Sequence, residues 1–369
     1  MPFADFHGHA PVVAQLRDMM SRERLPHSII LAGPEGAGKY TLALMVAKAM
    51  NCLQPPPGAP DFCGRCNNCT RIALSDDLEA RFQEAVEARE NLREADKKDT
   101  RLFVQTHPDV LVIPPDPPQM MIKVDQVRHL IAGVHYSPSA GKRRFYIFTE
   151  ASFMKEAANS LLKVLEEPPD FATLFLLAEN PGELLPTIRS RCIAVRLAPV
   201  GIAELEAYLT QCQPRWGAGQ RALVARLAGG GIGRARSFNL EAYTAARKDA
   251  FLLLESSLHR EDHSALFRAT ETYRAGVEGK ARTDQLIRAL YSVLEDLLVL
   301  YSGQPGMVRN TDALPQLKKL AAGSDFAWIA TAAQRLGEVE SGMRRNLLRS
   351  LALDAFATGL EPAPGRAPL

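Results

Sequence analysis

Short apolar runs alternate with amphipathic segments along the first 200 residues of the chain. Five runs of five or six residues have the length of strands, and polar turns that contain Gly, Asn or Pro separate them from the next element. They cover residues 28–32, 109–113, 144–149, 173–178 and 192–196. Apolar residues recur with helical spacing in other segments, which are 41–50, 124–134 and 155–165. This alternation predicts an α/β core in which a parallel sheet carries helices on its faces.

The strand pattern stops near residue 200, and the rest of the chain has the pattern of helices broken by polar or glycine turns. The glycines at 229–233 indicate a hinge or turn. We expect a small helical unit over 201–245, a larger all-α domain over 246–358 and a disordered tail over 359–369. In the larger domain, one helix has an apolar face typical of packing against other helices, formed by Leu286, Leu290, Val293, Leu294, Leu297, Leu298 and Tyr301.

Two unusual segments interrupt the predicted core of residues 1–200. Residues 52–70 contain clustered cysteines and prolines, and residues 76–101 consist largely of charged side chains. The charged segment has few large apolar residues, so we expect a solvated helix or a mobile insertion there and assign it no function.

Composition narrows the class of protein. Of the 369 residues, 46% are hydrophobic and 23% are charged, which is typical of folded globular proteins, and the length favours two or three domains. No run of about 18 apolar residues occurs and the first residues lack a secretory pattern, so we expect a cytoplasmic protein without membrane contact. The formal net charge of +2 argues against a nucleic-acid-binding protein that acts alone.

A glycine-rich loop, LAGPEGAGKYTLA, follows the first predicted strand and opens a helix. Lys39 is placed to reach the outer oxygens of a bound phosphate. The next position, where Ser or Thr would hold Mg²⁺, is Tyr40, and Thr41 follows one residue later. The motif predicts a nucleotide-binding fold with weakened hydrolysis, and a glycine turn without a ligand is the alternative. Three glycines would let backbone N–H groups face the phosphate: Gly33, Gly36 and Gly38.

The acidic residues that would complete an ATPase site are only partly present. They are expected after another strand, where RRFYIFTEASFM places Thr149 and Glu150. Thr149 stands where an Asp would help to hold Mg²⁺, whereas Glu150 could still polarise a water molecule. Since two independent metal ligands are altered, the sequence predicts an ATPase fold without hydrolysis of its own. ATP or ADP at Lys39 is a cofactor candidate that these changes weaken.

Four of the six cysteines are clustered. Cys63, Cys66 and Cys69 have C-x2-C-x2-C spacing, and Cys52 precedes them across a proline-rich stretch. Without a secretory signal, such clustering favours a metal over disulfides, and four thiolates can close a tetrahedron around a structural Zn²⁺. An iron–sulfur cluster and unligated thiols are the alternatives. The run after Cys69 does not continue to the Cys-Pro pair of a ferredoxin, which favours zinc.

Residues 157–192 carry a further pattern, AANSLLKVLEEPPDFATLFLLAENPGELLPTIRSRC. Together with HSIILAGPEGAGK and the four-cysteine module, it resembles the clamp-loader branch of the AAA+ ATPases, the family that contains the gamma/tau and delta-prime subunits of bacterial DNA polymerase III. The resemblance covers about the first 200 residues at the level of motifs. It implies a P-loop AAA+ core with an inserted zinc module, followed by a small helical lid and an all-α collar.

The resemblance also implies roles for individual residues. Ser190, Arg191 and Cys192 match the family's Ser-Arg-Cys motif, whose arginine reaches into the ATP site of a neighbouring subunit. Arg191 would then be an arginine finger in trans, because a guanidinium is always charged and offers two donors to a phosphate. A helix at the subunit interface matches LLKVLEEPP, for which a solvated helix end is the alternative, and this match involves Lys163, Glu166 and Glu167.

Two further motifs of the family are altered. Ala178 stands where sensor 1 would place a Thr or Ser. Gly233 stands where the sensor 2 arginine is expected, and Arg234 follows one position late. These losses favour a subunit of the delta-prime type, which does not hydrolyse ATP itself, over one of the gamma/tau type.

The resemblance implies a subunit of the DNA polymerase III holoenzyme that is not itself a polymerase. It would join gamma/tau and delta subunits in a hetero-oligomeric ring and, through that assembly, help to place the sliding clamp on primed DNA. An active ATPase motor of gamma/tau type, with Thr41 in the role of Tyr40, is one alternative. The other is a zinc-bearing DNA-binding module, whose basic patch would be Lys142, Arg143 and Arg144.

Overall fold

The chain folds into two compact units. In the computed structural model, residues 2–58, 60–258, 264–273, 276–343 and 348–360 are described. The first unit comprises Met1–Leu205 and Gly229–Arg234, and the second comprises Glu206–Ala228 and Ala235–Leu369. The short segment Gly229–Arg234 thus belongs with the α/β part of the chain, although helical segments flank it in sequence.

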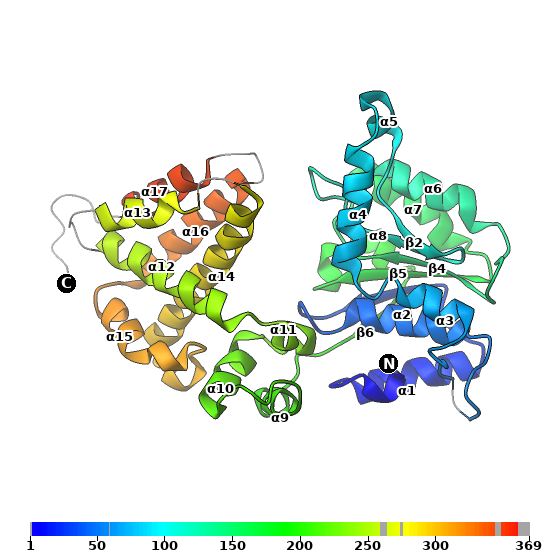
Figure 1. Ribbon diagram of the computed structural model, residues 1–369, viewed down its shortest axis with the longest axis horizontal. Helices are drawn as coiled ribbons and strands as arrows, with labels where there is room; N and C mark the ends of the chain where they lie inside the picture. Colours follow the sequence, from blue (N-terminus) through cyan, green and yellow to red (C-terminus); the bar gives the residue numbers. More distant parts are fainter. Residues whose placement is uncertain (1, 59, 259–263, 274–275, 344–347, 361–369) are drawn as a thin grey trace. The chain divides into compact units, whose positions relative to one another are not determined.

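A six-stranded sheet forms the centre of the first unit (Figure 1). Five strands run parallel, and β2 at one edge runs antiparallel to β3. β1 and β5 are buried along their whole length, as expected of central parallel strands. The five predicted strands are confirmed, and β2 is an addition. In spatial order the strands are β2 (Val104–His107), β3 (Val110–Ile113), β4 (Arg144–Phe148), β5 (Ala172–Ala178), β1 (Ser28–Ala32) and β6 (Ile193–Arg196).

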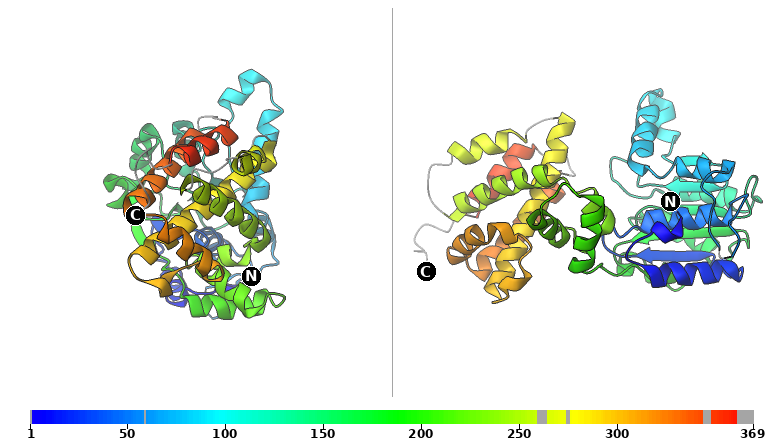
Figure 2. Two further views of the ribbon diagram at one scale, coloured as in Figure 1. Left: turned by 90° about the vertical axis from the view of Figure 1, so that its left-hand side faces the viewer. Right: turned by 60° about the horizontal axis from the view of Figure 1, so that its bottom comes forward.

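Helices cover both faces of this sheet, as Figures 1 and 2 show. On one face, the core that contains α1 and α2 includes Ile29 and Leu31 of β1. On the other face, the core that contains α6 and α7 includes Ile30 and Ala32. Successive side chains of a strand point to opposite faces, so β1 contributes to both cores. The covering helices are α1 (Ala10–Ser21), α2 (Lys39–Met50), α6 (Val124–Val134) and α7 (Lys155–Glu166).

The charged segment 76–101 forms two helices. α4 (Leu78–Glu90) has no buried residue, in agreement with the predicted solvated helix, and α5 (Glu94–Asp99) follows it. Arg89 in the last turn of α4 forms an ion pair of 2.6 Å with Asp116, whose side chain is fully buried. This ion pair adds to the packing of the half-buried Leu78 against the core.

The described part of the second unit is all-α, as predicted. Five members of the predicted apolar stripe on α14 are buried in its core, but the prediction is wrong for Leu298 and Tyr301, which are exposed. None of the described helices is long and apolar enough to cross a membrane. The principal helices of this part are α10 (Ala218–Leu227), α12 (Leu240–Leu258), α13 (Ser264–Glu271), α14 (Gly276–Tyr301), α15 (Leu314–Ala322), α16 (Phe326–Met343) and α17 (Arg349–Thr358).

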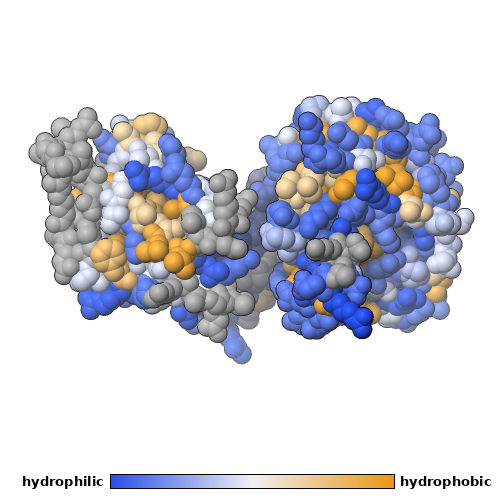
Figure 3. Space-filling view, turned by 90° about the horizontal axis from the view of Figure 1, so that it is seen from above, coloured by the Kyte–Doolittle hydropathy of each residue, from blue (hydrophilic) through white to orange (hydrophobic). Residues whose placement is uncertain are grey.

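Two helices lie where the chain passes from one unit to the other. α9 (Ile202–Cys212) begins in the first unit, and α11 (Ile232–Arg236) ends in the second. On the face drawn in Figure 3, hydrophobic patches interrupt the hydrophilic surface of each unit.

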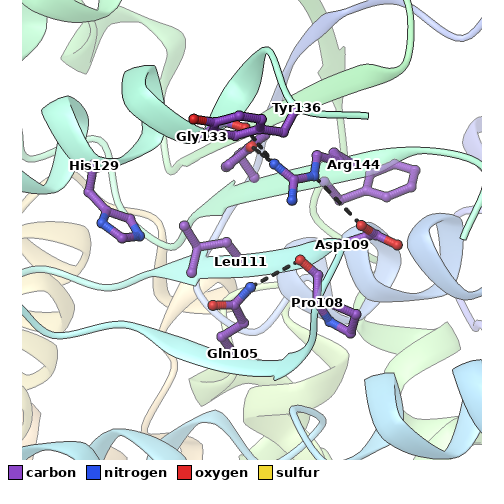
Figure 4. Close-up of a pocket in the computed structure, with 10 residues that line it drawn as sticks. Gln105, Pro108, Asp109, Leu111, His129, Gly133, Tyr136 and Arg144 are labelled. Carbon is purple, nitrogen blue, oxygen red and sulfur yellow. Dashed lines mark hydrogen bonds and ion pairs between the residues drawn. The ribbon is translucent and has the colours of Figure 1, made fainter. Parts of the chain in front are cut away.

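A buried carboxylate fixes the loop between α6 and β4. Asp109 accepts hydrogen bonds of 2.7–2.8 Å from the backbone N–H groups of Ser139, Ala140 and Gly141, and Arg144 lies 3.6 Å away (Figure 4). Burial alone would raise the pKa of Asp109, but the three backbone donors hold it below its ordinary value. The conformation of this loop therefore depends on an ionised Asp109.

Asp109→Ala should destabilise the first unit by about 2–4 kcal/mol, because three backbone N–H groups lose their buried acceptor and Arg144 loses its partner. Amide hydrogen exchange of β3 and β4, read by mass spectrometry, would measure this loss. Tryptophan fluorescence would not, since Trp216 and Trp328 both lie in the second unit. Because the folded pKa is depressed, the contribution is complete above the unfolded pKa near 3.9 and disappears as the pH falls through the folded value.

Asp18→Ala is a suitable control for this measurement. It removes an exposed ion pair between Asp18 on α1 and Arg22, the residue after that helix, so the free energy of unfolding should change by less than about 0.5 kcal/mol. Equal effects of the Asp109 and Asp18 substitutions would contradict the role of Asp109.

Candidate functional site

The predicted phosphate loop lies between β1 and α2. Gly36 and Gly38 have φ values of +74° and +88°, a region that favours glycine. A Cβ added at Gly33 would come within 2.4 Å of the carbonyl oxygen of Leu197. The backbone of the loop thus requires these three glycines, independently of any bound phosphate.

Lys39, the first residue of α2, is turned toward its own loop. Its Nζ donates hydrogen bonds to the carbonyl oxygens of Gly33 at 2.6 Å and Pro34 at 2.9 Å. Burial lowers the pKa of Lys39, although nearby carboxylates, chiefly that of Glu179, act in the opposite direction. The ammonium group therefore has acceptors within the chain, where a nucleotide would otherwise offer phosphate oxygens.

Tyr40 anchors the first turn of α2 to the core. Its hydroxyl donates a hydrogen bond of 2.7 Å to the carbonyl oxygen of Ser75, and burial raises the pKa of the phenol well above its ordinary value. Thr41 is exposed at the next position, about 100° further around the helix. The Tyr40 hydroxyl is thus used within the chain, at the position where an ATPase has a metal-binding Ser or Thr.

The segment Gly229–Arg234 lies directly on the phosphate loop. The backbone N–H of Gly233 donates a hydrogen bond of 2.7 Å to the carbonyl oxygen of Gly36. A Cβ added at Gly231 would come within 2.1 Å of the carbonyl oxygen of Glu35, and Arg234 lies 3.6 Å from the carboxylate of the same residue. The glycine run, which predicted only a hinge or turn, permits this backbone-to-backbone contact. The close spacing of these glycines is the sequence signal that another backbone approaches the segment closely.

The ends of β4 and β5 carry the other predicted nucleotide-site positions. Thr149 and Glu150 follow β4, and Ser152 donates a hydrogen bond of 3.4 Å to Glu150. Ala178 ends β5, and its carbonyl oxygen accepts a hydrogen bond of 3.2 Å from Gly33 N at the start of the phosphate loop. Ala178 thus lies beside the phosphate loop, and its methyl group cannot hydrogen-bond to a phosphate, so the sensor 1 assignment stays a prediction.

Arg191 follows the four-residue helix α8 (Pro186–Arg189) and lies at the surface of the first unit. Its Nη1 donates hydrogen bonds to the carbonyl oxygen of Thr187 at 2.9 Å and to Ser190 Oγ at 3.3 Å. Its Nη2 lies 2.6 Å from Oε1 of Glu166, in the last turn of α7. The predicted finger is therefore held by its own chain from two helices.

An open hollow of about 700 Å³ borders Arg191 and Glu166. Arg143, which is nine-tenths buried, lines the hollow as well; its Nη2 donates a hydrogen bond of 2.8 Å to the carbonyl oxygen of Asp170. The Nε of Arg143 has no partner within the described residues. Next to Arg191, burial raises the pKa of Cys192 to about 12, so this thiol stays protonated.

The basic patch predicted at residues 142–144 is not formed as a free surface. Arg143 is nearly buried, and Arg144 donates to the carbonyl oxygen of Gly133 and lies beside Asp109. Two of the three cations are therefore used within the fold, which weakens the alternative of a DNA-binding module.

The structure brings the four clustered cysteines together. Their Sγ atoms lie within 4.8 Å of one another, and those of Cys52 and Cys66 are 4.0 Å apart. Four sulfurs bound to one Zn²⁺ at about 2.3 Å would be about 3.8 Å apart. The backbone N–H groups of Cys63 and Cys66 donate to the sulfurs of Cys52 and Cys63 at 3.3 Å. With Cys69 as the fourth donor, the set fits a single metal ion.

Comparison with known proteins gives consistent matches in the α/β part. Residues 8–201, more than half of the chain, match the family model described as DNA polymerase III, delta subunit. The DNA polymerase III subunit delta' of Pseudomonas aeruginosa is 32% identical over 194 residues, which are 52% of this chain and 49% of that protein.

Two further relatives are also subunits of DNA polymerase III. Subunit delta' of Bacillus subtilis is 25% identical over 320 residues, 84% of this chain and 83% of that protein. Subunit tau of Escherichia coli is 28% identical over 208 residues, 56% of this chain and 27% of that protein. The match thus spans about half the length of the Pseudomonas relative and about a quarter of the tau relative. With more than half of its residues matched, the chain belongs to the DNA polymerase III delta subunit family, which confirms the resemblance to the clamp-loader branch of the AAA+ ATPases.

Proposed function

We propose that this chain is a clamp-loader subunit of the delta-prime type, which does not hydrolyse ATP itself and donates Arg191 to the ATP site of a neighbouring subunit. The observation that carries the proposal is that the chain engages its own phosphate loop. Lys39 donates hydrogen bonds to carbonyl groups of the loop, and the Tyr40 hydroxyl donates to the carbonyl oxygen of Ser75. The segment Gly229–Arg234 packs against the loop and donates a backbone hydrogen bond to it. A loop engaged in this way favours a structural role over catalysis.

Arg191 has the properties that a finger in trans requires. Its side chain is one-third exposed beside an open hollow, so a partner can reach it. The guanidinium is permanently charged and can offer two N–H donors to the γ-phosphate as charge develops there. Thr187 and Ser190 are neutral acceptors that hold the Nη1 side, while Nη2 faces a charged group.

The wider assembly follows from the family. Residues 1–200 would form the AAA+ core, 201–245 the helical lid and 246–358 a collar that oligomerises with the other subunits. Subunits of gamma/tau and delta type would be the neighbours in a cytoplasmic ring. The sliding clamp and primed DNA would be engaged through this ring during replication, as the resemblance to clamp loaders implies.

Arg191→Ala should lower ATP turnover at the neighbouring site by about 10³-fold, the lower end of the range for arginine fingers. The total ATPase rate of the assembled loader, measured with clamp and primed DNA, should fall by the fraction that this neighbouring site contributes. Assembly should persist, because the side chain is at the surface.

Arg189→Ala gives the matched control, since Arg189 is an exposed arginine on the same short helix. It should leave the ATPase rate unchanged. An unchanged rate with Arg191→Ala would refute the finger assignment.

The isolated chain should release no phosphate from MgATP above the background rate, because Tyr40, Thr149 and Ala178 all lack the expected ligand groups. A phosphate-release assay on the pure protein measures this directly. Hydrolysis that Lys39→Ala abolishes would instead establish the gamma/tau alternative, to which the 28% identity with the tau relative also points.

We further propose that the four-cysteine cluster holds a structural Zn²⁺. Four thiolates complete a tetrahedral shell and leave no position for a water or substrate, so the ion would stabilise the fold and have no part in catalysis. It would tie the segment after α2 to α3 (Asn67–Ala73), because Cys52 follows α2 and Cys69 lies on α3.

The purified protein should be colourless and contain one zinc per chain by mass spectrometry of the metal. Cys69→Ser should lose the zinc and lower the melting temperature, because Cys69 is buried and supplies one of four ligands. Cys212→Ser, at a cysteine that belongs to the second unit and is not part of the cluster, should retain one zinc. Iron with visible absorbance would overturn the zinc assignment.

A further inference from the structure

We propose that Glu166 is the resting partner of the finger Arg191 and competes with the neighbouring γ-phosphate for its guanidinium. This inference rests on the proposed function of Arg191 and adds a second residue, with a positioning role, to that site. Glu166 would thereby set how tightly the neighbouring subunit binds ATP.

The contact between the two side chains is short and charged. Nη2 of Arg191 lies 2.6 Å from Oε1 of Glu166, whereas the acceptors of Nη1, which are Thr187 O and Ser190 Oγ, are neutral. A γ-phosphate is the same kind of acceptor as a carboxylate, since both are anions that take N–H donors. The phosphate must therefore displace Glu166 or share the guanidinium with it.

The position of Glu166 makes this competition costly for the phosphate. Glu166 is the last residue of α7, which Pro168 prevents from continuing. A negative charge at a helix C-terminus is unfavourable, because the last carbonyl groups carry partial negative charge. In the isolated chain, the positive charge of Arg191 offsets the negative charge of Glu166. If Arg191 moved away to bind a phosphate, the charge of Glu166 at the helix end would lose its partner.

The lining of the hollow strengthens the inference. Its three carboxylates and three guanidinium groups balance, so the hollow has no net charge that would by itself attract a phosphate. Attraction for the neighbour's nucleotide must come from Arg191 as it separates from Glu166. The charged groups of the lining are Glu23, Glu166, Asp170, Arg24, Arg143 and Arg191.

Glu166→Gln tests this directly, because it retains a hydrogen-bond acceptor for Arg191 and removes the charge. The measurement is steady-state hydrolysis of MgATP by an assembled loader in which only the site next to this chain is active. KM for ATP should fall by up to about fivefold, the factor that corresponds to the strongest exposed ion pairs. Glu156→Gln is the matched control, since it replaces an exposed carboxylate in the first turn of the same helix, at the end opposite to Glu166, and it should leave KM unchanged.

The Arg191→Ala background separates competition from a merely structural effect. In that background Glu166→Gln should no longer change KM, because no guanidinium remains to be released. An unchanged or higher KM with Glu166→Gln alone, or the same decrease in both backgrounds, would overturn the proposed competition and leave the finger intact. A loader that Arg191→Ala does not affect would instead refute the finger itself, and the competition with it. Both carboxylates are exposed, and thermal melting would verify that each variant is folded.

Discussion

The close backbone contact between the phosphate loop and the segment Gly229–Arg234 is the constraint on which the chemistry of the first unit depends. A Cβ at Gly36 or Gly231 would clash with the opposite segment. The backbone N–H of Gly233 donates a hydrogen bond to the carbonyl oxygen of Gly36 and stabilises the contact. With the loop held in this way, Lys39 finds its acceptors in the loop itself. The loop is thus held by contacts with other parts of its own chain.

The two cations that the family would use on ATP are therefore held very differently. Lys39 is partly buried and bonded to two backbone carbonyl groups, which move only with the loop. Arg191 is held at the surface, where an exposed ion pair contributes only about 0–1 kcal/mol. An incoming phosphate can compete for Arg191 at an energy of this size, whereas freeing Lys39 would break two hydrogen bonds of a partly buried ammonium group. This contrast agrees with a subunit whose contribution to hydrolysis is made outside its own site.

Most of the α/β fold could be predicted from the sequence, and the exceptions have a common physical origin. Buried strands have continuous apolar runs, which are visible without any knowledge of their neighbours. β2 escaped prediction because it is an edge strand with only two buried residues and an irregular register. The ion pair between Arg89 of α4 and Asp116 escaped as well, because charged pairs distant in sequence leave no periodic signal. The exposed Leu298 and Tyr301 continue a helical stripe beyond the core that buries its other members.

The sequence by itself determined the groups that can do chemistry: the glycines and Lys39 of the loop, the four cysteines, and Ser190 with Arg191. Each of these patterns is local, because loop conformation and metal-ligand spacing depend on residues a few positions apart. The tertiary structure alone decided what each charged group contacts. It placed Glu35 beside Arg234 and Glu166 beside Arg191, and it used two of three cations of a predicted basic patch inside the fold. Coulomb energy depends on distance in space, and only the folded chain sets the distance between residues far apart in sequence.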